Sequence, residues 1–410
     1  MSDIYITGAA MTAFGGFPER SVKDLTREAV SMVLRDSGSN GIRPEMAFFA
    51  NCTQGLFEGQ TAVPGQIALR SMGLESLPVV NVENACASGT AAFHLACTQV
   101  LSGCSDIALA VGCEKMTAAD KSKVFSLFEG GWDVHAADAI AARLRRLGGG
   151  VEPPPETVNE TPKSVFMDVY AAIARYHMKH FGLTERQLAT VSAKNHFHST
   201  FNPLSQYRKD MSVDEVLAAR IVAWPLRLPM CSPVSDGAAA AVVCNGRGLS
   251  RLNAKRAINI LACVAGAAVD REWEEFDRHI VRRAADDAYA RAKLGPGDLS
   301  LAEVHDATAF GEIIQSECIG LCATGAGGLL AESGATRLGG SIPVNVSGGL
   351  ESKGHPVGAT GLAQIYELVT QLRGAAGARQ VPGARVGLAV NSGGFYGVEE
   401  AAAYVTILAR

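Results

Sequence analysis

The strongest constraint on the fold is a succession of strand and helix patterns that occurs twice along the chain. Apolar runs bounded by turn residues predict strands, and apolar residues three or four positions apart predict helices. In the first half these patterns predict strands at 3–8, 46–52, 78–82 and 106–112, and helices at 22–37 and 88–102. In the second half they predict strands at 257–264, 301–305, 342–346 and 385–390, and helices at 276–293, 309–321 and 360–373. The repeated order predicts a duplicated α/β unit whose sheets are covered by helices.

A stretch of different character separates the two halves. Residues 119–233 contain a Pro/Gly-rich piece at 148–155, a predicted helix at 164–181 and a polar segment at 194–207. A long insertion of this kind usually serves as a lid or cap. The run Asp236–Cys244 then returns as a buried strand, so the first half closes only after the insertion. We therefore predict an N-terminal half (1–118 plus 234–250), an inserted loop domain (119–233) and a C-terminal half (251–410).

Composition and charge exclude several classes of protein. The 410 residues are 48% hydrophobic and 19% charged, with a formal net charge of −4, which gives no electrostatic reason to bind nucleic acid or an anionic membrane. The first residues lack the pattern of a secretory signal peptide, and no apolar run reaches the roughly 18 residues that a membrane span needs. The cysteines form no Cys-x-x-Cys pair. We therefore expect a protein of the reducing cytoplasm.

The first segment suited to catalysis is Asn84-Ala85-Cys86-Ala87-Ser88-Gly89, between a predicted strand and a predicted helix. A cysteine at a helix N-terminus lies at the positive end of the dipole and near free N–H groups, and both favour the nucleophilic thiolate. The Cys86 N–H can also point at the oxyanion formed on a bound carbonyl. The alternative is a cysteine packed in a tight turn, and this segment alone does not decide between the two.

Two histidines lie in comparable strand-to-helix connections. His355 is in the glycine-rich stretch 348–361, in a turn fixed by Pro356, which suits proton transfer or hydrogen bonding to an enolate oxygen. His305 follows a predicted strand, at the edge where open α/β sheets place their active sites. We expect Asp306 either to orient the His305 ring or to cap the helix predicted from 309, with the cap favoured.

A last glycine-rich segment, Asn391-Ser392-Gly393-Gly394-Phe395-Tyr396-Gly397, follows the final predicted strand. Its glycines allow backbone N–H groups to come close to a ligand, and an ordinary turn is the alternative. In the inserted stretch, His135, Phe166 and Met167 are candidates for a pocket lining, although packing or surface positions are favoured for all three.

Taken in order, these segments resemble the thiolase family over essentially the whole chain. Residues 354–361 (GHPVGATG) match the histidine loop of that family. Residues 84–89 resemble its nucleophile loop, in which Cys86 would carry the acyl group. His305-Asp306 and residues 230–239 (MCSPVSDGAA) are similar to the sterol-carrier-protein type, where Ser232 would lie near the pantetheine arm of CoA.

The resemblance implies a thiolase-like fold, in which duplicated βαβαβ halves form a five-layer αβαβα core with an inserted loop domain. It implies a transferase of lipid metabolism, an acyl-CoA C-acyltransferase of the acetyl-CoA acetyltransferase kind. CoA and acyl-CoA would be substrates, with no tightly bound cofactor and no metal. It further implies a homodimer or tetramer, and a small zinc-ribbon/OB-fold protein as a possible partner.

One departure from the family pattern concerns the second cysteine that thiolases commonly use as an acid/base. The two positions where it occurs hold Asn391 and Ala307. The remaining set of Cys86, His305 and His355 is more like the Cys-His-His set of the related ketoacyl synthases. We keep Asn391 among the candidate catalytic residues because it occupies one of these positions.

We therefore expect a two-stage reaction in which Cys86 first forms an acyl-enzyme. The N–H groups of Cys86 and Gly393 would hold the oxyanion, and His305 and His355 would hold the enolate oxygen of the second thioester. His355 could move the α-proton alone, or with help from Tyr396 or Glu399, for both of which simple packing is favoured.

Two other functions stay open from the sequence. One is a Claisen-condensing enzyme or a retro-aldolase that acts on CoA-linked substrates without ordinary thiolysis. The other is a non-catalytic subunit of a thiolase complex, against which the presence of Cys86, His305 and His355 argues.

Overall fold

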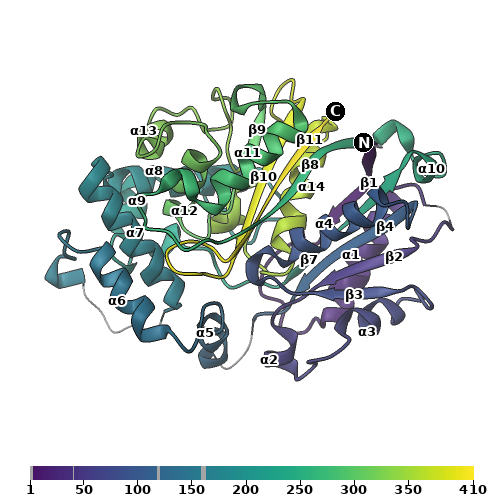
Figure 1. Cartoon of the computed structure of the whole chain (residues 1–410), viewed down its shortest axis with the longest axis horizontal. Coiled ribbons are helices and arrows are strands. Elements are labelled where there is room, and N and C mark those ends of the chain that lie inside the picture. The colour runs from purple at the N-terminus through teal and green to yellow at the C-terminus, as the bar shows by residue number, and fades with distance from the viewer. Residues whose placement is uncertain (1–2, 40, 118–120, 158–162) are drawn as a thin grey trace.

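The computed structural model describes residues 3–39, 41–117, 121–157 and 163–410 (Figure 1). The strands of the first half are β1 (Ile4–Met11), β2 (Met46–Ala50), β3 (Val79–Val82), β4 (Ile107–Glu114) and β7 (Gly237–Asn245). They lie side by side in the order β3-β2-β4-β7-β1. β2 is parallel to β3 and β4, whereas β7 is antiparallel to β4 and β1. The first half therefore closes only after the inserted stretch, as predicted.

The second half repeats this arrangement strand by strand. Its strands are β8 (Ile258–Ala267), β9 (Leu301–Glu303), β10 (Val386–Gly393) and β11 (Ala402–Ala409), in the order β8-β11-β10-β9. The predicted strand at 342–346 is reduced to a bridge between Val344 and Ala302, because Pro343 has no N–H to donate to a ladder. β11, which the sequence patterns did not predict, is the counterpart of β7 and lies antiparallel to β8 and β10.

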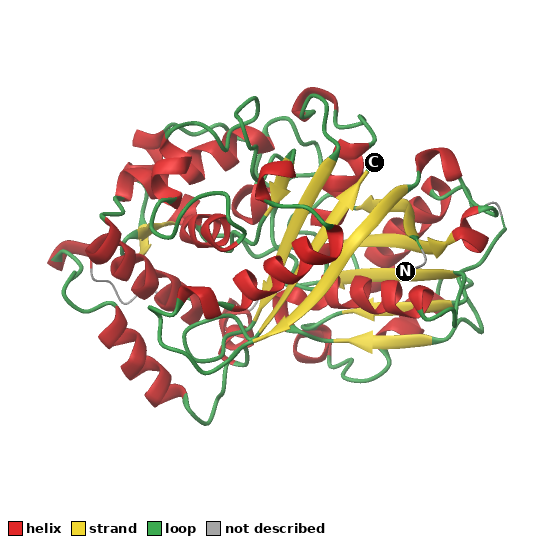
Figure 2. Cartoon of the chain, turned by 45° about the horizontal axis from the view of Figure 1, so that its top comes forward, coloured by secondary structure: helices red, strands yellow, loops and turns green. Residues whose placement is uncertain are grey.

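Two helices fill the space between the halves. α4 (Ser88–Leu101) and α14 (Thr360–Leu372) pack against each other and against strands of both halves, in one hydrophobic cluster that includes Phe93 and Leu362. α1 (Val22–Asp36) covers the outer face of the first half, and α11 (Ile280–Ala292) covers that of the second. These layers give the predicted αβαβα core (Figure 2). The two halves also join edge to edge, through an antiparallel pairing of β1 with β8.

The inserted stretch forms a helical region beside the second half, drawn in teal in Figure 1. Its elements are α5 (Lys121–Glu129), α6 (Ala137–Leu147), α7 (Val165–Phe181), α8 (Glu185–Ser199), α9 (Val213–Ala218), β5 (Ile221–Ala223) and β6 (Leu226–Arg227). α8 packs on α12 (Ala309–Cys318) and α13 (Gly327–Glu332). The sequence did not predict α8, because it buries polar residues such as Lys194 and Asn195 that obscure an apolar period. The exact domain boundaries stay a prediction.

The remaining helices are short: α2 (Gln54–Glu58), α3 (Pro64–Arg70) and α10 (Gly246–Leu249). The predicted helix at 276–293 begins at Ile280, because a single 3₁₀ turn at Phe276–Arg278 precedes it. Each helix in the described part of the chain is too short or too polar to cross a membrane.

Candidate active site

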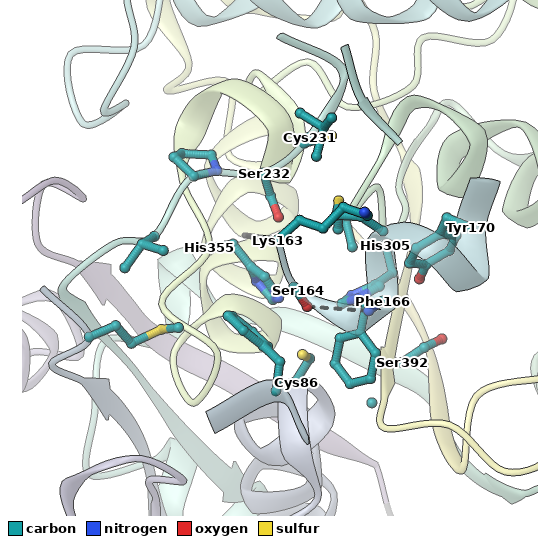
Figure 3. Close-up of a pocket in the computed structure, with 18 of the residues that line it drawn as sticks. Cys86, Lys163, Ser164, Phe166, Tyr170, Cys231, Ser232, His305, His355 and Ser392 are labelled. Atoms are coloured by element: carbon teal, nitrogen blue, oxygen red, sulfur yellow. Dashed lines mark hydrogen bonds between the residues drawn. The ribbon is translucent and has the colours of Figure 1, made fainter. Parts of the chain in front are cut away.

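Three loops that are far apart in the chain bring Cys86, His305 and His355 together (Figure 3). The sulfur of Cys86 and one ring nitrogen of each histidine all lie within 4.8 Å of one another. The two imidazole rings have centroids 5.4 Å apart and are nearly perpendicular, at 80°. All three side chains are buried. The convergence expected from the sequence is therefore present.

The local backbone explains how Cys86 is presented. It lies in a 3₁₀ turn, Ala85–Ala87, directly before α4, and Ala85 has a left-handed φ of 47°. Ser88 Oγ accepts a hydrogen bond from the Asn84 N–H and donates one to the Ala85 carbonyl, both at 2.7 Å. A side chain at Gly89 would place its Cβ 2.8 Å from the Gly358 carbonyl oxygen. The glycine therefore lets the nucleophile turn pack directly on the histidine loop.

The resting state of Cys86 differs from the sequence expectation. Burial, and after it the carboxyl of Glu114, raises the pKa of the Cys86 thiol to about 12. The expected thiolate at a helix N-terminus is thus wrong, because desolvation outweighs the dipole at this depth. Cys86 rests as a thiol and needs a base to become a nucleophile.

A hydrogen bond at one ring nitrogen fixes the orientation of His355. Its Nδ1 lies 2.7 Å from the Thr360 hydroxyl, which itself donates to the Pro356 carbonyl at 2.9 Å. Because the hydroxyl hydrogen is already used, Nδ1 carries the proton and donates to Thr360, which leaves Nε2 with a free lone pair. Burial holds the pKa of His355 well below its usual value, so the ring is neutral.

His305 has the opposite tautomer. Its Nδ1 lies 3.2 Å from the Asn391 side-chain nitrogen, while the Asn391 oxygen accepts from the Thr90 hydroxyl at 2.9 Å. Nδ1 therefore accepts a hydrogen bond, and Nε2 carries the proton as a donor. Burial lowers the pKa of His305 to about 3. Asn391 thus contacts the His305 ring and is not part of the cavity lining described below.

Asp306 has neither of the two roles considered from the sequence. Its carboxylate accepts from the backbone N–H groups of Leu350 at 2.7 Å and Glu351 at 3.4 Å, and from the Asn195 amide at 3.1 Å. The cap of α12 is Thr308. Asp306 therefore ties the end of β9 to the loop that leads to His355, a contact that only the folded chain reveals.

The three groups line a cavity of about 480 Å³. Ser232 and Gly393 line it as predicted, and so do Phe166 and Met167, for which packing was favoured. His135 is exposed and is not part of this lining. A side chain at Gly393 would place its Cβ 2.9 Å from the Cys86 nitrogen, so only glycine lets β10 approach the nucleophile turn.

Sequence reasoning missed several polar residues of the cavity wall: Lys163, Tyr170, Arg220, Ser392 and Glu400. It considered Glu399 and Tyr396 instead. Glu399 is fully buried in an ion pair with Arg271 at 2.7 Å, and Tyr396 is 54% exposed. Adjacent side chains in this loop thus point in different directions. Because the loop is irregular, no sequence pattern indicates these directions.

The fold defines the class of protein, which is one with a duplicated α/β core. Two family models then identify the family. The thiolase N-terminal domain model matches residues 4–247, and the thiolase C-terminal domain-like model matches residues 268–410. The chain belongs to the thiolase family.

Two relatives agree with this assignment. Acetyl-CoA acetyltransferase of Methanothermobacter thermautotrophicus is 37% identical over 400 residues, which cover 96% of this chain and 97% of that protein. Sterol carrier protein 2 of Bos taurus is 35% identical over 402 residues, which cover 95% of this chain and 70% of that protein. The predicted resemblance is therefore confirmed, and the protein is an acyltransferase.

Two solved structures share the fold. The "Ltp2-ChsH2(DUF35) aldolase" has a TM-score of 0.77 at 20% identity and covers 99% of this chain and 97% of its own. Human mitochondrial 3-ketoacyl-CoA thiolase in complex with CoA has a TM-score of 0.67 at 15% identity, covering 100% of this chain and 98% of its own. At these identities the likeness shows the fold alone.

Proposed function

We propose that the protein forms or cleaves a carbon–carbon bond next to an acyl thioester, through an acyl-enzyme on Cys86. The observation that carries the proposal is the cluster of the Cys86 sulfur and the His305 and His355 nitrogens, within 4.8 Å on the wall of one cavity. A buried thiol, one neutral acceptor and one neutral donor are the groups that acyl transfer to sulfur requires.

In the first stage, His355 Nε2 accepts the thiol proton as the Cys86 sulfur attacks the thioester carbonyl. The bond from that carbon to the CoA sulfur then breaks, and the proton passes from His355 to the leaving CoA thiolate. The N–H groups of Cys86 and Gly393 stabilise the oxyanion, and each such donor typically contributes about 3 kcal/mol.

In the second stage, the enolate of another thioester attacks the acyl carbon and releases Cys86. His305, with its proton on Nε2, donates a hydrogen bond to the enolate oxygen. Because the ring is neutral and its pKa is depressed to about 3, it stabilises this charge without giving up its proton. His355 lines the same cavity, and its Nε2 lone pair is free again once CoA has left.

CoA would enter along the wall formed by Ser232, Lys163 and Arg220. The two cations suit the phosphates of CoA, and the Ser232 hydroxyl suits an amide of the pantetheine arm. A homodimer or tetramer, a small zinc-ribbon/OB-fold partner and a cytoplasmic location remain predictions from the sequence.

Intact-protein mass spectrometry after exposure to a panel of acyl-CoAs tests the proposal. The wild-type chain should gain the mass of one acyl group, and Cys86→Ala should gain none. Cys231→Ala is a matched control, because Cys231 lines the same cavity but has no part in this mechanism. Wild-type turnover by Cys86→Ala would rule the proposal out.

A second candidate is a retro-aldolase or Claisen-condensing enzyme on CoA-linked substrates. The specific observation in its favour is that Asn391 and Ala307 occupy the positions of the usual second thiol. Incubation with acetoacetyl-CoA and CoA distinguishes the two functions, because only thiolysis yields acetyl-CoA from this mixture.

A further inference from the structure

Glu400 is a buried carboxyl group on the wall of the same cavity as Cys86, His305 and His355. It lies in the loop between β10 and β11 and is 4% exposed. Tyr170 and Ser392 line the same cavity, and Figure 3 shows both side chains beside it. The reaction proposed above assigns no part to this group.

The immediate partners of Glu400 are neutral. The Gln315 amide donates to its Oε1 at 3.0 Å, and His279 Nε2 lies 3.7 Å from its Oε2. His279 Nδ1 accepts from the Val281 N–H, and burial holds the pKa of His279 well below its usual value. His279 is therefore a neutral ring that faces Glu400 with a donor, not with a positive charge.

The charged and titratable groups on the surrounding elements also leave Glu400 without a cation. Arg271 is the nearby cation, and its guanidinium is paired with Glu399 at 2.7 Å, where both side chains are fully buried. Tyr170 on α7 and Cys318 on α12 face Glu400, and both have pKa values raised by burial and by its charge. Among the described residues Glu400 thus has no ion-pair partner except the neutral His279, and burial raises its pKa to about 7.

We propose that Glu400 is the group that moves the α-proton of the second thioester, in place of the missing second thiol. This inference rests on the proposed function. The carboxylate of Glu400 takes the proton as the Cα–H bond breaks, and the electron pair forms the enolate that His305 holds. The enolate carbon then bonds to the acyl carbon, the Cys86–acyl bond breaks, and the proton on Glu400 is available to restore the Cys86 thiol.

The chemistry favours Glu400 over His305 for this step. His305 has its Nε2 occupied by a proton and donates to the enolate oxygen. His355 Nε2 is free again once CoA has taken the thiol proton, and unchanged deuterium uptake in Glu400→Gln would assign the step to it. A carboxyl group that is half-ionised near neutral pH can both accept and return a proton, which the forward and reverse reactions need.

Glu400→Gln tests the inference, because it keeps the shape and removes the carboxylate that accepts the proton. With acetyl-CoA, acylation of Cys86 followed by mass spectrometry should stay within threefold of wild type. Deuterium uptake from D₂O into the α-carbon of acetyl-CoA should fall about 100-fold or more. In wild type the uptake should rise with pH through about 7, and Glu400→Gln should lose this rise.

Two further variants keep the test decisive. Glu400→Asp should show slower uptake but retain a pH-dependent rise, which a purely structural role would not produce. Tyr396→Phe, a change at an exposed residue of the same loop, should match wild type. Uptake by Glu400→Gln within threefold of wild type, or an unchanged pH profile, would overturn the inference. Absence of any acyl adduct on wild-type Cys86 would overturn both the proposed function and this inference. Normal acylation with unchanged deuterium uptake would overturn this inference alone.

Discussion

The two halves of the molecule repeat one fold, but equivalent positions in them have very different surroundings. In each half a buried carboxyl group lies just before the strand that returns into the sheet, Asp236 before β7 and Glu400 before β11. Asp236 accepts from Lys115 Nζ at 2.8 Å and from the N–H groups of Met116 and Thr117 at 2.7 and 2.8 Å. Glu400 has a side-chain donor in Gln315, at 3.0 Å, and no lysine or arginine paired with it among the described residues.

The consequence is opposite in the two halves. Burial raises the pKa of Asp236, but Lys115 and the hydrogen bonds to Thr117 outweigh it, so the pKa is lowered overall. Burial raises the pKa of Glu400 to about 7 and outweighs its own backbone N–H, Arg271 and Gln315, which act in the opposite direction. A carboxylate surrounded by donors is a fixed structural clamp, whereas one that lacks them can exchange a proton near neutral pH. The two halves thus have a buried carboxyl group at similar positions. The neighbouring side chains lower the pKa of one of them and leave the pKa of the other raised.

A second equivalence explains why the site forms at all. Cys86 precedes α4 in the first half, and His355 precedes α14 in the second. Because α4 and α14 pack together between the sheets, the starts of the two helices meet. In the proposed mechanism, one half thus contributes the nucleophile and the other contributes its base.

The largest expected effect comes from removing the base that the second half contributes. His355→Ala should slow acylation of Cys86 by about 1,000-fold, within the usual range for general-base catalysis. The rate should then keep rising with pH, because the thiol has a pKa of about 12 and must ionise unaided. Rapid-quench mass spectrometry measures the rate, and acylation at wild-type speed would show that the pairing of the two halves is not catalytic.

The ion pair of Lys115 with Asp236 in the first half should contribute more to the free energy of unfolding than Glu400 does. Asp236→Asn leaves Lys115 buried without its partner, which should lower the free energy of unfolding by about 3–5 kcal/mol in urea titrations. Glu400→Gln at pH 4.5 should change it by no more than about 1 kcal/mol, since the folded chain then has a protonated carboxyl, which loses little on becoming an amide. If both variants lost the same free energy of unfolding, the distinction between a structural Asp236 and a proton-exchanging Glu400 would be contradicted.

The raised pKa of Glu400 should also make the free energy of unfolding depend on pH. The pKa of Glu400 is about 7 in the folded chain against an ordinary 4.5, so the folded state binds the extra proton between these values. Its contribution is therefore complete below pH 4.5 and is lost as pH rises through about 7, by about 3 kcal/mol in total. Unfolding of Glu400→Gln at pH 5 and pH 8 should lack this loss; a difference from wild type that is constant with pH would contradict it.

The smallest expected effect concerns the residue that sets the tautomer of His355. Thr360→Val removes the acceptor of the Nδ1 proton and should slow acylation about tenfold, the equivalent of about 1.4 kcal/mol. Thr370→Val is a matched control, because Thr370 makes the same type of hydrogen bond to the carbonyl four residues earlier in α14. Equal rates for the two variants would mean that Thr360 does not orient the ring.

Local patterns were sufficient for most of the core and for the main residues of the candidate site. Strands such as β2 and β4 are short apolar runs between turns, and the loops before α4 and α14 have distinctive glycine-rich sequences. Sequence patterns were insufficient where contacts with residues far away in the chain decide the structure. β11 and α8 were missed, and the cap of α12 was given to Asp306, although Thr308 supplies it.

By itself the sequence determined the duplicated order of strands and helices, because apolar period and turn residues are encoded locally. It also determined which loops contain Cys86, His305 and His355. Only the tertiary structure decided that Cys86 rests as a thiol, that the two rings have opposite tautomers, and that Glu400 instead of Glu399 reaches the cavity. Each of these depends on burial and on partners tens or hundreds of residues away, and an ionisable side chain takes its chemistry from those neighbours.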